Sequence, residues 1–249
     1  MSRLPRIPLP DGVLPASGRP RLLPEDEHHL RAVLRIRPGS RVCFFTAAGC
    51  EIEATVTCLS PLTVAPVGAR ELDTEPAAVV VLHPTVLRPG FMSMIMEKAT
   101  ELGAVAVEPI VTEWSVAASA RGAEKEVRRW ERIAREAVKQ CGRSRAPRIA
   151  CPEALEACLR HVPPRDLLIV LHPAAGELPP AAPDDRLAAI LGESGLRLFI
   201  GPEGGFSSRD IALLAAHGAV SWRLGPRILR AETAAVAGLA ILQRLLGNL

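Results

Sequence analysis

Three short segments in the C-terminal third carry glycine, proline, arginine and carboxylate groups directly after apolar runs. They are His172 and Pro173 after LLIVL, GPEGG (201–205) after LFI, and LGPRILRAETA (224–234) after VSW. Glycine lets backbone amides and carbonyls approach a ligand closely. Because ligands of open α/β sheets bind at the carboxyl ends of the strands, the three segments together predict one binding pocket.

The GPEGG segment favours a neutral or cationic small molecule over a nucleoside triphosphate. It lacks the lysine of the GxxxxGK[ST] phosphate loop and does not fit GxGxxG. Glu203 would repel phosphate but would accept a cationic or hydroxyl-bearing ligand. A plainer interpretation is a tight turn before a helix that Ser207 or Ser208 caps and Gly218 ends, with a helix start that can also bind an anion.

Arg227, Arg230 and Glu232 are the charged groups of the last segment. An isolated RILR motif is most simply explained as exposed arginines ahead of a helix with an acidic first turn. Beside two other ligand-type loops, the same side chains become candidates for chemistry on a substrate.

Composition and charge narrow the class of protein. The chain has 249 residues, 48% hydrophobic and 23% charged, with a formal net charge of +3, which is typical of globular proteins. No apolar run reaches bilayer-spanning length, and the proline-broken N-terminus lacks a signal-peptide core, so we expect a cytoplasmic protein. Arginine is concentrated in 1–41 and 121–148, which favours a polyanionic partner such as nucleic acid.

The six cysteines predict neither a metal site nor a disulfide framework. They form no CxxC pair, and none lies near a histidine at zinc-finger spacing. We expect the cysteines to be small, buried, apolar side chains of a protein in a reducing compartment.

The sequence pattern of the first third of the chain predicts a β-rich module. Residues 41–59 contain two strand-like runs around a turn at 47–49, and a short helix is expected over 25–36, ended by Pro38 and Gly39. The polar segment 67–76 marks the expected domain boundary.

From residue 77 onward, strands and helices alternate, which predicts an α/β domain with a mostly parallel sheet. Strands are expected at 78–83, 104–110, 167–172, 196–201 and 219–224, and helices at 92–102, 124–141 and 232–246.

Five longer segments, in order along nearly the whole chain, resemble one protein family. They are HHLRAVLRIRPGSRV (28–42), EKATELGAVAVEPIVTEWS (97–115), RWERIAREAVKQCGRSRAP (129–147), FIGPEGGFSSRDI (199–211) and LGPRILRAETAAVAGL (224–239). They are similar to the small-subunit ribosomal RNA uridine-N3 methyltransferases, which belong to the SPOUT class of S-adenosylmethionine-dependent enzymes. Their joint occurrence makes the resemblance specific.

The resemblance implies a fold and an activity. A small PUA-like RNA-binding β-barrel domain would occupy 1–75. A SPOUT methyltransferase domain with a mostly parallel sheet and a C-terminal trefoil knot would occupy 76–249. The enzyme would be a cytoplasmic homodimer, without metal, that methylates N3 of one uridine in the 16S rRNA of the small ribosomal subunit.

The resemblance also implies roles for individual residues. S-adenosylmethionine would be held by Leu171, His172, Pro173, Gly201, Pro202, Glu203, Gly204, Gly205, Leu224, Gly225, Arg227, Ile228 and Leu229. RNA would be bound by Arg3, Arg6, His29, Arg31, Arg35, Lys98, Gln140, Arg143 and Arg145. Arg230 would stabilise the charge that develops on the uracil as N3 loses its proton, and Glu232 would orient Arg230 or accept that proton.

Two short segments depart from the family pattern. Residues 88–91 read Arg-Pro-Gly-Phe where the family usually has Lys-Gly-Asp-Arg, and 46–47 read Thr-Ala where it has Asp-Gly. The first departure bears on an RNA or dimer contact and the second on turn geometry, and neither is expected to touch the cofactor loops.

Three other functions fit parts of the sequence less well. One is a SPOUT enzyme acting on another RNA position, and another is an RNA-binding or ribosome-assembly protein that has lost catalysis. A nucleotide hydrolase would need a lysine in GPEGG and a cluster of carboxylates for a metal, which the sequence does not show.

Overall fold

The computed structural model describes residues 4–115, 123–177 and 194–249. The chain forms two compact units. The first comprises Met1–Glu75 together with Val138–Arg145, and the second comprises Pro76–Ala137 together with Ala146–Leu249. The chain therefore passes between the units three times.

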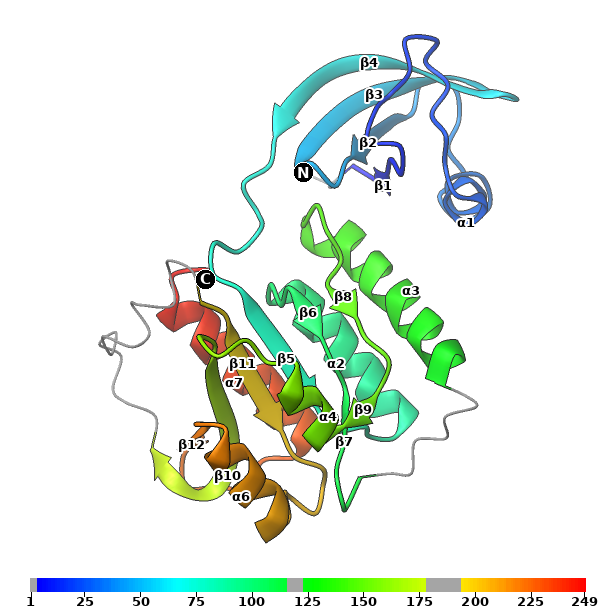
Figure 1. The fold of residues 1–249 in the computed structure, drawn as a ribbon. Coiled ribbons are helices and arrows are strands. Elements are labelled where there is room, and N and C mark those ends of the chain that lie inside the picture. The colour runs from blue at the N-terminus through cyan, green and yellow to red at the C-terminus, as the bar shows by residue number, and fades with distance from the viewer. Residues whose placement is uncertain (1–3, 116–122, 178–193) are drawn as a thin grey trace. The chain divides into compact units, whose positions relative to one another are not determined.

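The first unit contains a four-stranded sheet (Figure 1). Its strands, in spatial order, are β1 (Arg6–Pro8), β2 (Arg41–Phe45), β3 (Cys50–Leu59) and β4 (Leu62–Glu71). β1 is parallel to β2, and the other pairs are antiparallel. Its apolar side chains, including Ile7, Leu30 and Phe44, form a core of their own.

The helix predicted over 25–36 is shorter than expected. It consists of α1 (Pro24–His28) and a π-helical turn, η1 (His29–Val33). Arg35, with φ of 49°, takes the left-handed conformation and breaks the helix before Pro38. β1 and β4 were not anticipated, and β4 extends into the polar segment that was expected to lie between the domains.

The second unit is built on a six-stranded sheet in which every pair is parallel. The strands, in spatial order, are β12 (Val220–Arg223), β10 (Leu167–Glu177), β11 (Leu196–Ile200), β5 (Val80–Pro84), β6 (Ala106–Val107) and β8 (Arg148–Ile149). The prediction of an α/β domain with a mostly parallel sheet is confirmed.

Helices cover both faces of this sheet (Figure 1). The larger core joins the sheet to α2 (Pro89–Glu101), α3 (Ala123–Cys141) and α7 (Ala231–Leu245). The smaller one joins its other face to α4 (Leu155–Arg160) and α6 (Ser208–Ala216). Alternate residues of β11 serve the two cores, because side chains of a strand point to opposite faces in turn.

The segment 104–110 was predicted as one strand and forms two. β6 ends before Glu108 and Pro109, and β7 (Ile110–Val111) pairs with β9 (Glu153–Ala154) in a separate small sheet. All six cysteines are free thiols. The expectation that they are buried holds for Cys43 and Cys158 but is wrong for Cys58 and Cys151, which are exposed.

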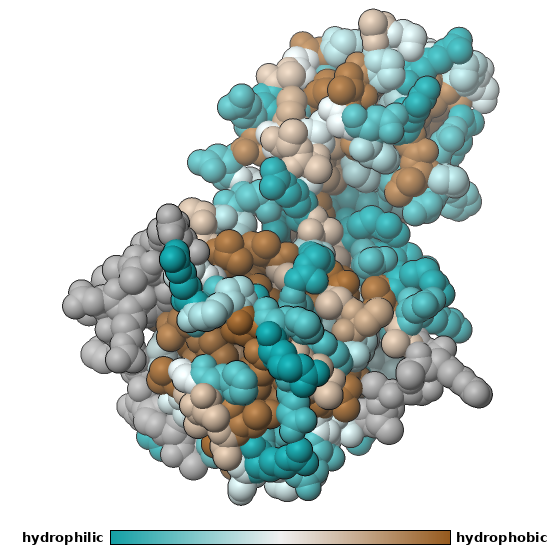
Figure 2. Space-filling model, viewed as in Figure 1, coloured by the Kyte–Doolittle hydropathy of each residue, from teal (hydrophilic) through white to brown (hydrophobic). Residues whose placement is uncertain are grey.

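Surface hydropathy is mixed in the visible face of both units, where hydrophilic side chains surround smaller groups of apolar ones (Figure 2). Within the described residues, no helix has the length and apolar character that crossing a membrane requires.

Candidate active site

Sheet topology brings the three loop segments to one edge. From β5 the chain continues through β6 to β8 at one side, whereas β11, β10 and β12 lie on the other side of β5. Strand order therefore reverses between β5 and β11, and in such sheets the ligand crevice lies beyond the carboxyl ends of the strands at this point.

A cavity of about 380 Å³ lies at the ends of β10, β11 and β12, within the size range of small-molecule sites. Its lining residues are Leu171, His172, Pro173, Ile200, Gly201, Pro202, Glu203, Gly204, Gly205, Phe206, Trp222, Arg223, Leu224, Arg227, Ile228, Leu229, Arg230, Ala231 and Ala234. All thirteen predicted cofactor residues except Gly225 line this cavity. The structure thus brings the three segments together as the strand ends suggested.

Six lining residues were missed from sequence, and they are mostly apolar. Ile200 ends β11, Trp222 is the penultimate residue of β12, Phe206 follows GPEGG, and Ala231 and Ala234 belong to the first turn of α7. Nothing in their residue types distinguishes them from core positions. Their positions next to the three loop segments along the chain are the one signal that could have identified them.

The GPEGG loop is held in one conformation by local contacts. The Gly205 amide donates to the Pro202 carbonyl at 2.8 Å, and Gly205 has φ of 77°, which favours glycine. Ser207 then caps α6, because its Oγ accepts from the Asp210 amide and the Asp210 carboxylate accepts from the Ser207 amide. The predicted cap at Ser207 is confirmed, and Gly218, with φ of 80°, follows the end of the helix.

Glu203 has an ion-pair partner that the sequence did not reveal. Arg88 Nη2 lies 3.9 Å from Glu203 Oε2, and both side chains are more than half exposed. The expectation that the unusual segment 88–91 stays away from the cofactor loops is therefore wrong. Arg88 immediately precedes α2 at the end of β5, so the parallel strands place it beside the loop that follows β11.

Arg230 and Glu232 lie at the start of α7 in contrasting environments. Arg230 is exposed at the N-cap position and lines the cavity. Glu232 is only 6% exposed, and among the described residues its Oε2 has no hydrogen-bond partner. The same described residues include no ion pair between Glu232 and Arg230. An orienting contact between them is thus not present.

Comparison with known proteins decides the family. The model of the RNA methyltransferase domain matches residues 74–243. Ribosomal RNA small subunit methyltransferase E of Mycobacterium tuberculosis is 32% identical over 246 residues, covering 91% of this chain and 87% of that protein. The chain belongs to this family.

Solved structures of similar proteins agree with this membership. A proposed methyltransferase from Legionella pneumophila, solved with its bound cofactor SAM, is 31% identical, with a TM-score of 0.85 and 98% of each chain covered. Ribosomal RNA small subunit methyltransferase E from Neisseria gonorrhoeae, also bound to S-adenosyl methionine, is 24% identical, with a TM-score of 0.82 and the same coverage. The latter likeness concerns the fold alone.

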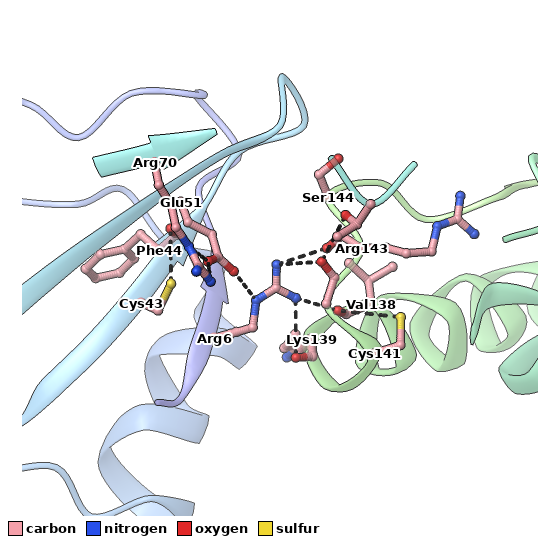
Figure 3. Close-up of polar contacts among 12 residues, drawn as sticks. Arg6, Cys43, Phe44, Glu51, Arg70, Val138, Lys139, Cys141, Arg143 and Ser144 are labelled. Carbon is pink, nitrogen blue, oxygen red and sulfur yellow. Dashed lines mark hydrogen bonds and ion pairs between the residues drawn. The ribbon is translucent and has the colours of Figure 1, made fainter. Parts of the chain in front are cut away.

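Arg6, predicted to bind RNA, is buried in the first unit (Figure 3). Its Nε donates to Glu51 at 2.7 Å, and its terminal nitrogens donate to carbonyls of Val138, Gly142 and Arg143 at 2.8–3.2 Å. Burial alone would raise the pKa of Glu51, but hydrogen bonds from Arg70 and Arg6 hold it below its ordinary value. A guanidinium engaged in this way has a structural role, so the expectation of a phosphate contact is corrected.

Arg143 is corrected for the same reason. It is 5% exposed, and its guanidinium donates to Glu75 at 2.8 and 3.2 Å. Burial would raise the pKa of Glu75, but this pair and the Ser144 and Arg145 amides lower it. Arg143 therefore stabilises the first unit from within.

The other predicted RNA-binding residues differ in how they are presented. Arg31, Arg35, Arg145 and Gln140 are exposed, and His29 is half-buried. Lys98 bonds Glu97 at 2.8 Å and Glu101 at 2.9 Å, which raises its pKa, so the ordinary helix-surface pairing is present. Arg3 lies outside the described residues.

A buried polar cluster lies between the sheet and α4. His83 Nδ1 is 3.4 Å from Cys158 Sγ, and Arg197 Nη1 is 3.3 Å from His83 Nε2 and 3.1 Å from Glu108. Histidine, thiol and carboxylate groups can all bind a metal ion. Here, however, the Arg197 guanidinium contacts both His83 Nε2 and Glu108, and its positive charge opposes a cation there. We interpret the cluster as structural.

Proposed function

We propose that this chain is an S-adenosylmethionine-dependent methyltransferase that methylates N3 of one uridine in the 16S rRNA of the small ribosomal subunit. The observation that carries the proposal is the convergence of three loops on one cavity at the carboxyl ends of β10, β11 and β12. Family membership and the SAM-bound Legionella relative support the choice of ligand.

The cavity suits S-adenosylmethionine better than a phosphorylated nucleotide. Its wall is rich in glycine and proline backbone, and no lysine is among its described lining residues. Glu203 at its edge tolerates a ligand with a sulfonium and an amino group but would oppose a triphosphate. The proposed cofactor contacts are the twelve predicted residues that line the cavity, and the cofactor supplies an electrophilic methyl group.

The chain's own residues must hold the uracil and manage the N3 proton. Arg230 is placed to stabilise negative charge on the uracil oxygens, because it is exposed and lines the cavity. Glu232 is the candidate acceptor for the proton, because Oε2 is buried without a partner in the described structure and a carboxylate in that state favours a substrate donor.

The larger organisation is proposed from the family. The first unit is a PUA-like RNA-binding module, the second contains a trefoil knot around the cofactor, and the enzyme is a cytoplasmic homodimer acting on the small subunit. Three exposed arginines of the first unit, Arg31, Arg35 and Arg145, would position RNA through phosphate contacts. Further candidates are His29, Lys98, Gln140 and Arg3.

Methylation of small subunits from a strain lacking the enzyme tests the proposal. We expect transfer of one methyl group per subunit from labelled S-adenosylmethionine, and mass analysis of rRNA fragments should place it on N3 of a single uridine. Naked 16S rRNA, assayed in parallel, tells whether the assembled subunit is needed.

Two outcomes would replace the proposal. Methylation at another atom or nucleotide would indicate a SPOUT enzyme of different specificity. No calorimetric binding of S-adenosylmethionine would indicate an RNA-binding or assembly protein.

A further inference from the structure

Trp114 is a large aromatic side chain exposed beside the proposed cofactor loop. It is 53% exposed, whereas the other two tryptophans, Trp130 and Trp222, are 2% and 8% exposed. It follows β7 at the carboxyl edge of the strands. A methyl group added to Gly204 would lie 3.5 Å from Trp114 Cε3 and 3.8 Å from its Cβ, so the indole packs against the GPEGG loop.

The turn that carries Trp114 is fixed by three hydrogen bonds. Ser115 Oγ accepts from the Thr112 amide at 3.0 Å and donates to the Thr112 carbonyl at 2.7 Å. The Ser115 amide also donates to that carbonyl at 3.2 Å. An aromatic ring held on a fixed turn, half in solvent, loses little conformational entropy when a flat ligand stacks on it.

Arg88 pairs with Glu203, the neighbouring residue of the same loop. Its guanidinium is 3.9 Å from Glu203, the residue before Gly204, and its side chain is 71% exposed. A pair at that distance leaves donors of the planar fork for a further acceptor. Trp114 and Arg88, from two other segments, thus place an aromatic face and a cation against adjacent residues of the loop that borders the proposed methyl-donor cavity.

We propose that Trp114 and Arg88 form the entry site for the RNA strand, a site that rests on the proposed function. Trp114 stacks on the base of a nucleotide adjacent to the target uridine, and Arg88, held by Glu203, contacts a phosphate of the same strand. Stacking on aromatic rings together with charge pairing to phosphate is how proteins hold unpaired nucleotides. The pair positions the strand and does not take part in methyl transfer.

Steady-state methylation of small subunits from the deletion strain tests the site. We expect Trp114→Ala to raise KM for the subunit about 5- to 100-fold, the range for loss of one base stack, and Trp114→Phe to retain most of the affinity. Calorimetry should give a dissociation constant for S-adenosylmethionine within about twofold of wild type. Arg88→Ala should weaken subunit binding and reduce the slope of log affinity against log salt by about one.

Arg209→Ala is the matched control. Arg209 pairs with Glu156, and the two side chains are 77% and 53% exposed, close to the 71% and 54% of Arg88 and Glu203. It should leave KM and the salt slope unchanged. Tryptophan fluorescence gives a second readout that does not need the alanine variant to fold, because RNA added to the cofactor-saturated protein should quench wild type but not Trp114→Phe.

Specific results would overturn the site. Weaker S-adenosylmethionine binding by Trp114→Ala, with an unchanged KM for the subunit, would make Trp114 a support of the cofactor loop. Dissociation of the variant into smaller species in light scattering would make it a contact between two copies of the chain. Absence of methyl transfer to any RNA by the wild type would instead contradict the proposed function.

Discussion

At the scale of single residues, Arg230 and Glu232 are the proposed catalytic groups, and each can be tested alone. Arg230→Ala should lower kcat about 10²- to 10³-fold, as loss of one charge-stabilising donor does. Because the side chain is exposed, the melting temperature should stay within a few degrees of wild type. Single-turnover methylation with saturating cofactor measures the effect, and near-normal rates would remove Arg230 from this role.

Glu232→Gln should separate stability from activity. A buried carboxylate oxygen without a partner costs folding free energy, so the neutral amide should leave the melting temperature unchanged or raise it. If Glu232 accepts the N3 proton, kcat should fall about 100-fold or more. A variant that is destabilised but fully active would show that the carboxylate serves only the start of α7.

At the scale of elements, sequence patterns predicted what local residues determine. The central strands β5, β10 and β11 are continuous apolar runs because helices cover both their faces, and α3 shows its buried stripe plainly. The two-residue strands β8 and β9 have no comparable pattern, since their pairing depends on neighbours elsewhere in the chain. For the same reason the convergence of the three loops on one cavity could be predicted from strand ends, whereas the Arg88–Glu203 and Trp114–Gly204 contacts, which join distant segments, could not.

His83 makes the stability of the second unit depend on pH. Burial, with the positive charge of Arg197, lowers the pKa of His83 from 6.5 to about 3. Below pH 6.5 the unfolded chain therefore binds a proton that the folded chain does not. Stability from this group is complete above pH 6.5 and declines toward pH 3, by up to about 1.4 kcal/mol per pH unit.

Urea unfolding of wild type and His83→Gln at several pH values from 7.5 to 4.5 measures this dependence. The variant should be less stable at pH 7.5, because it loses the stacking of the ring on Phe199. Its stability should then fall less steeply as pH decreases, since other titrating groups are common to both proteins. Parallel curves would contradict the shifted pKa.

Gly238 links the packing of α7 to the proposed cofactor cavity. A Cβ at this position would lie 2.7 Å from Leu171 Cδ1 and 3.4 Å from Leu198 Cδ2, and Leu171 lines the cavity. Gly238→Ala should push Leu171 toward the ligand and weaken S-adenosylmethionine binding several-fold. Overpacking costs about 1–3 kcal/mol, of which about 1 is offset by the helix preference of alanine.

Gly90→Ala is the control for this change. Gly90 also lies in a helix, and among the described residues no heavy atom apart from its chain neighbours and its own helix backbone is within 4 Å of the position its Cβ would take. It should be neutral or slightly stabilising and should leave cofactor affinity unchanged. Equal cofactor affinity in both variants would disprove the proposed link.

At the scale of the whole molecule, the assignment of 138–145 to the first unit explains why three basic residues of the arginine-rich segments 1–41 and 121–148 are turned away from solvent. Arg6, Lys139 and Arg143 each engage acceptors inside that unit. The Lys139–Asp26 pair, at 2.8 Å, is 11% and 3% exposed. A count of basic residues therefore overestimates the charge that this part of the chain presents to RNA.

Arg6 is the residue whose loss should affect this arrangement most. Its guanidinium donates to the carbonyls of Val138, in the last turn of α3, and of Gly142, just after the helix, where the helix dipole favours a positive charge. It also neutralises Glu51. Arg6→Ala leaves Glu51 with Arg70 as a partner, so we expect the free energy of unfolding to fall by about 3 kcal/mol, near the lower limit for breaking a buried pair.

Arg31→Ala is the control. It removes an exposed i,i+4 pair with Glu27 and should lower the free energy of unfolding by about 0.5 kcal/mol or less. Urea unfolding measures both, and hydrogen exchange should show that Arg6→Ala loses protection at the amides of 138–145. Should Arg6→Ala instead keep full stability but bind RNA with a smaller salt slope, Arg6 would be the phosphate contact that its sequence context suggested.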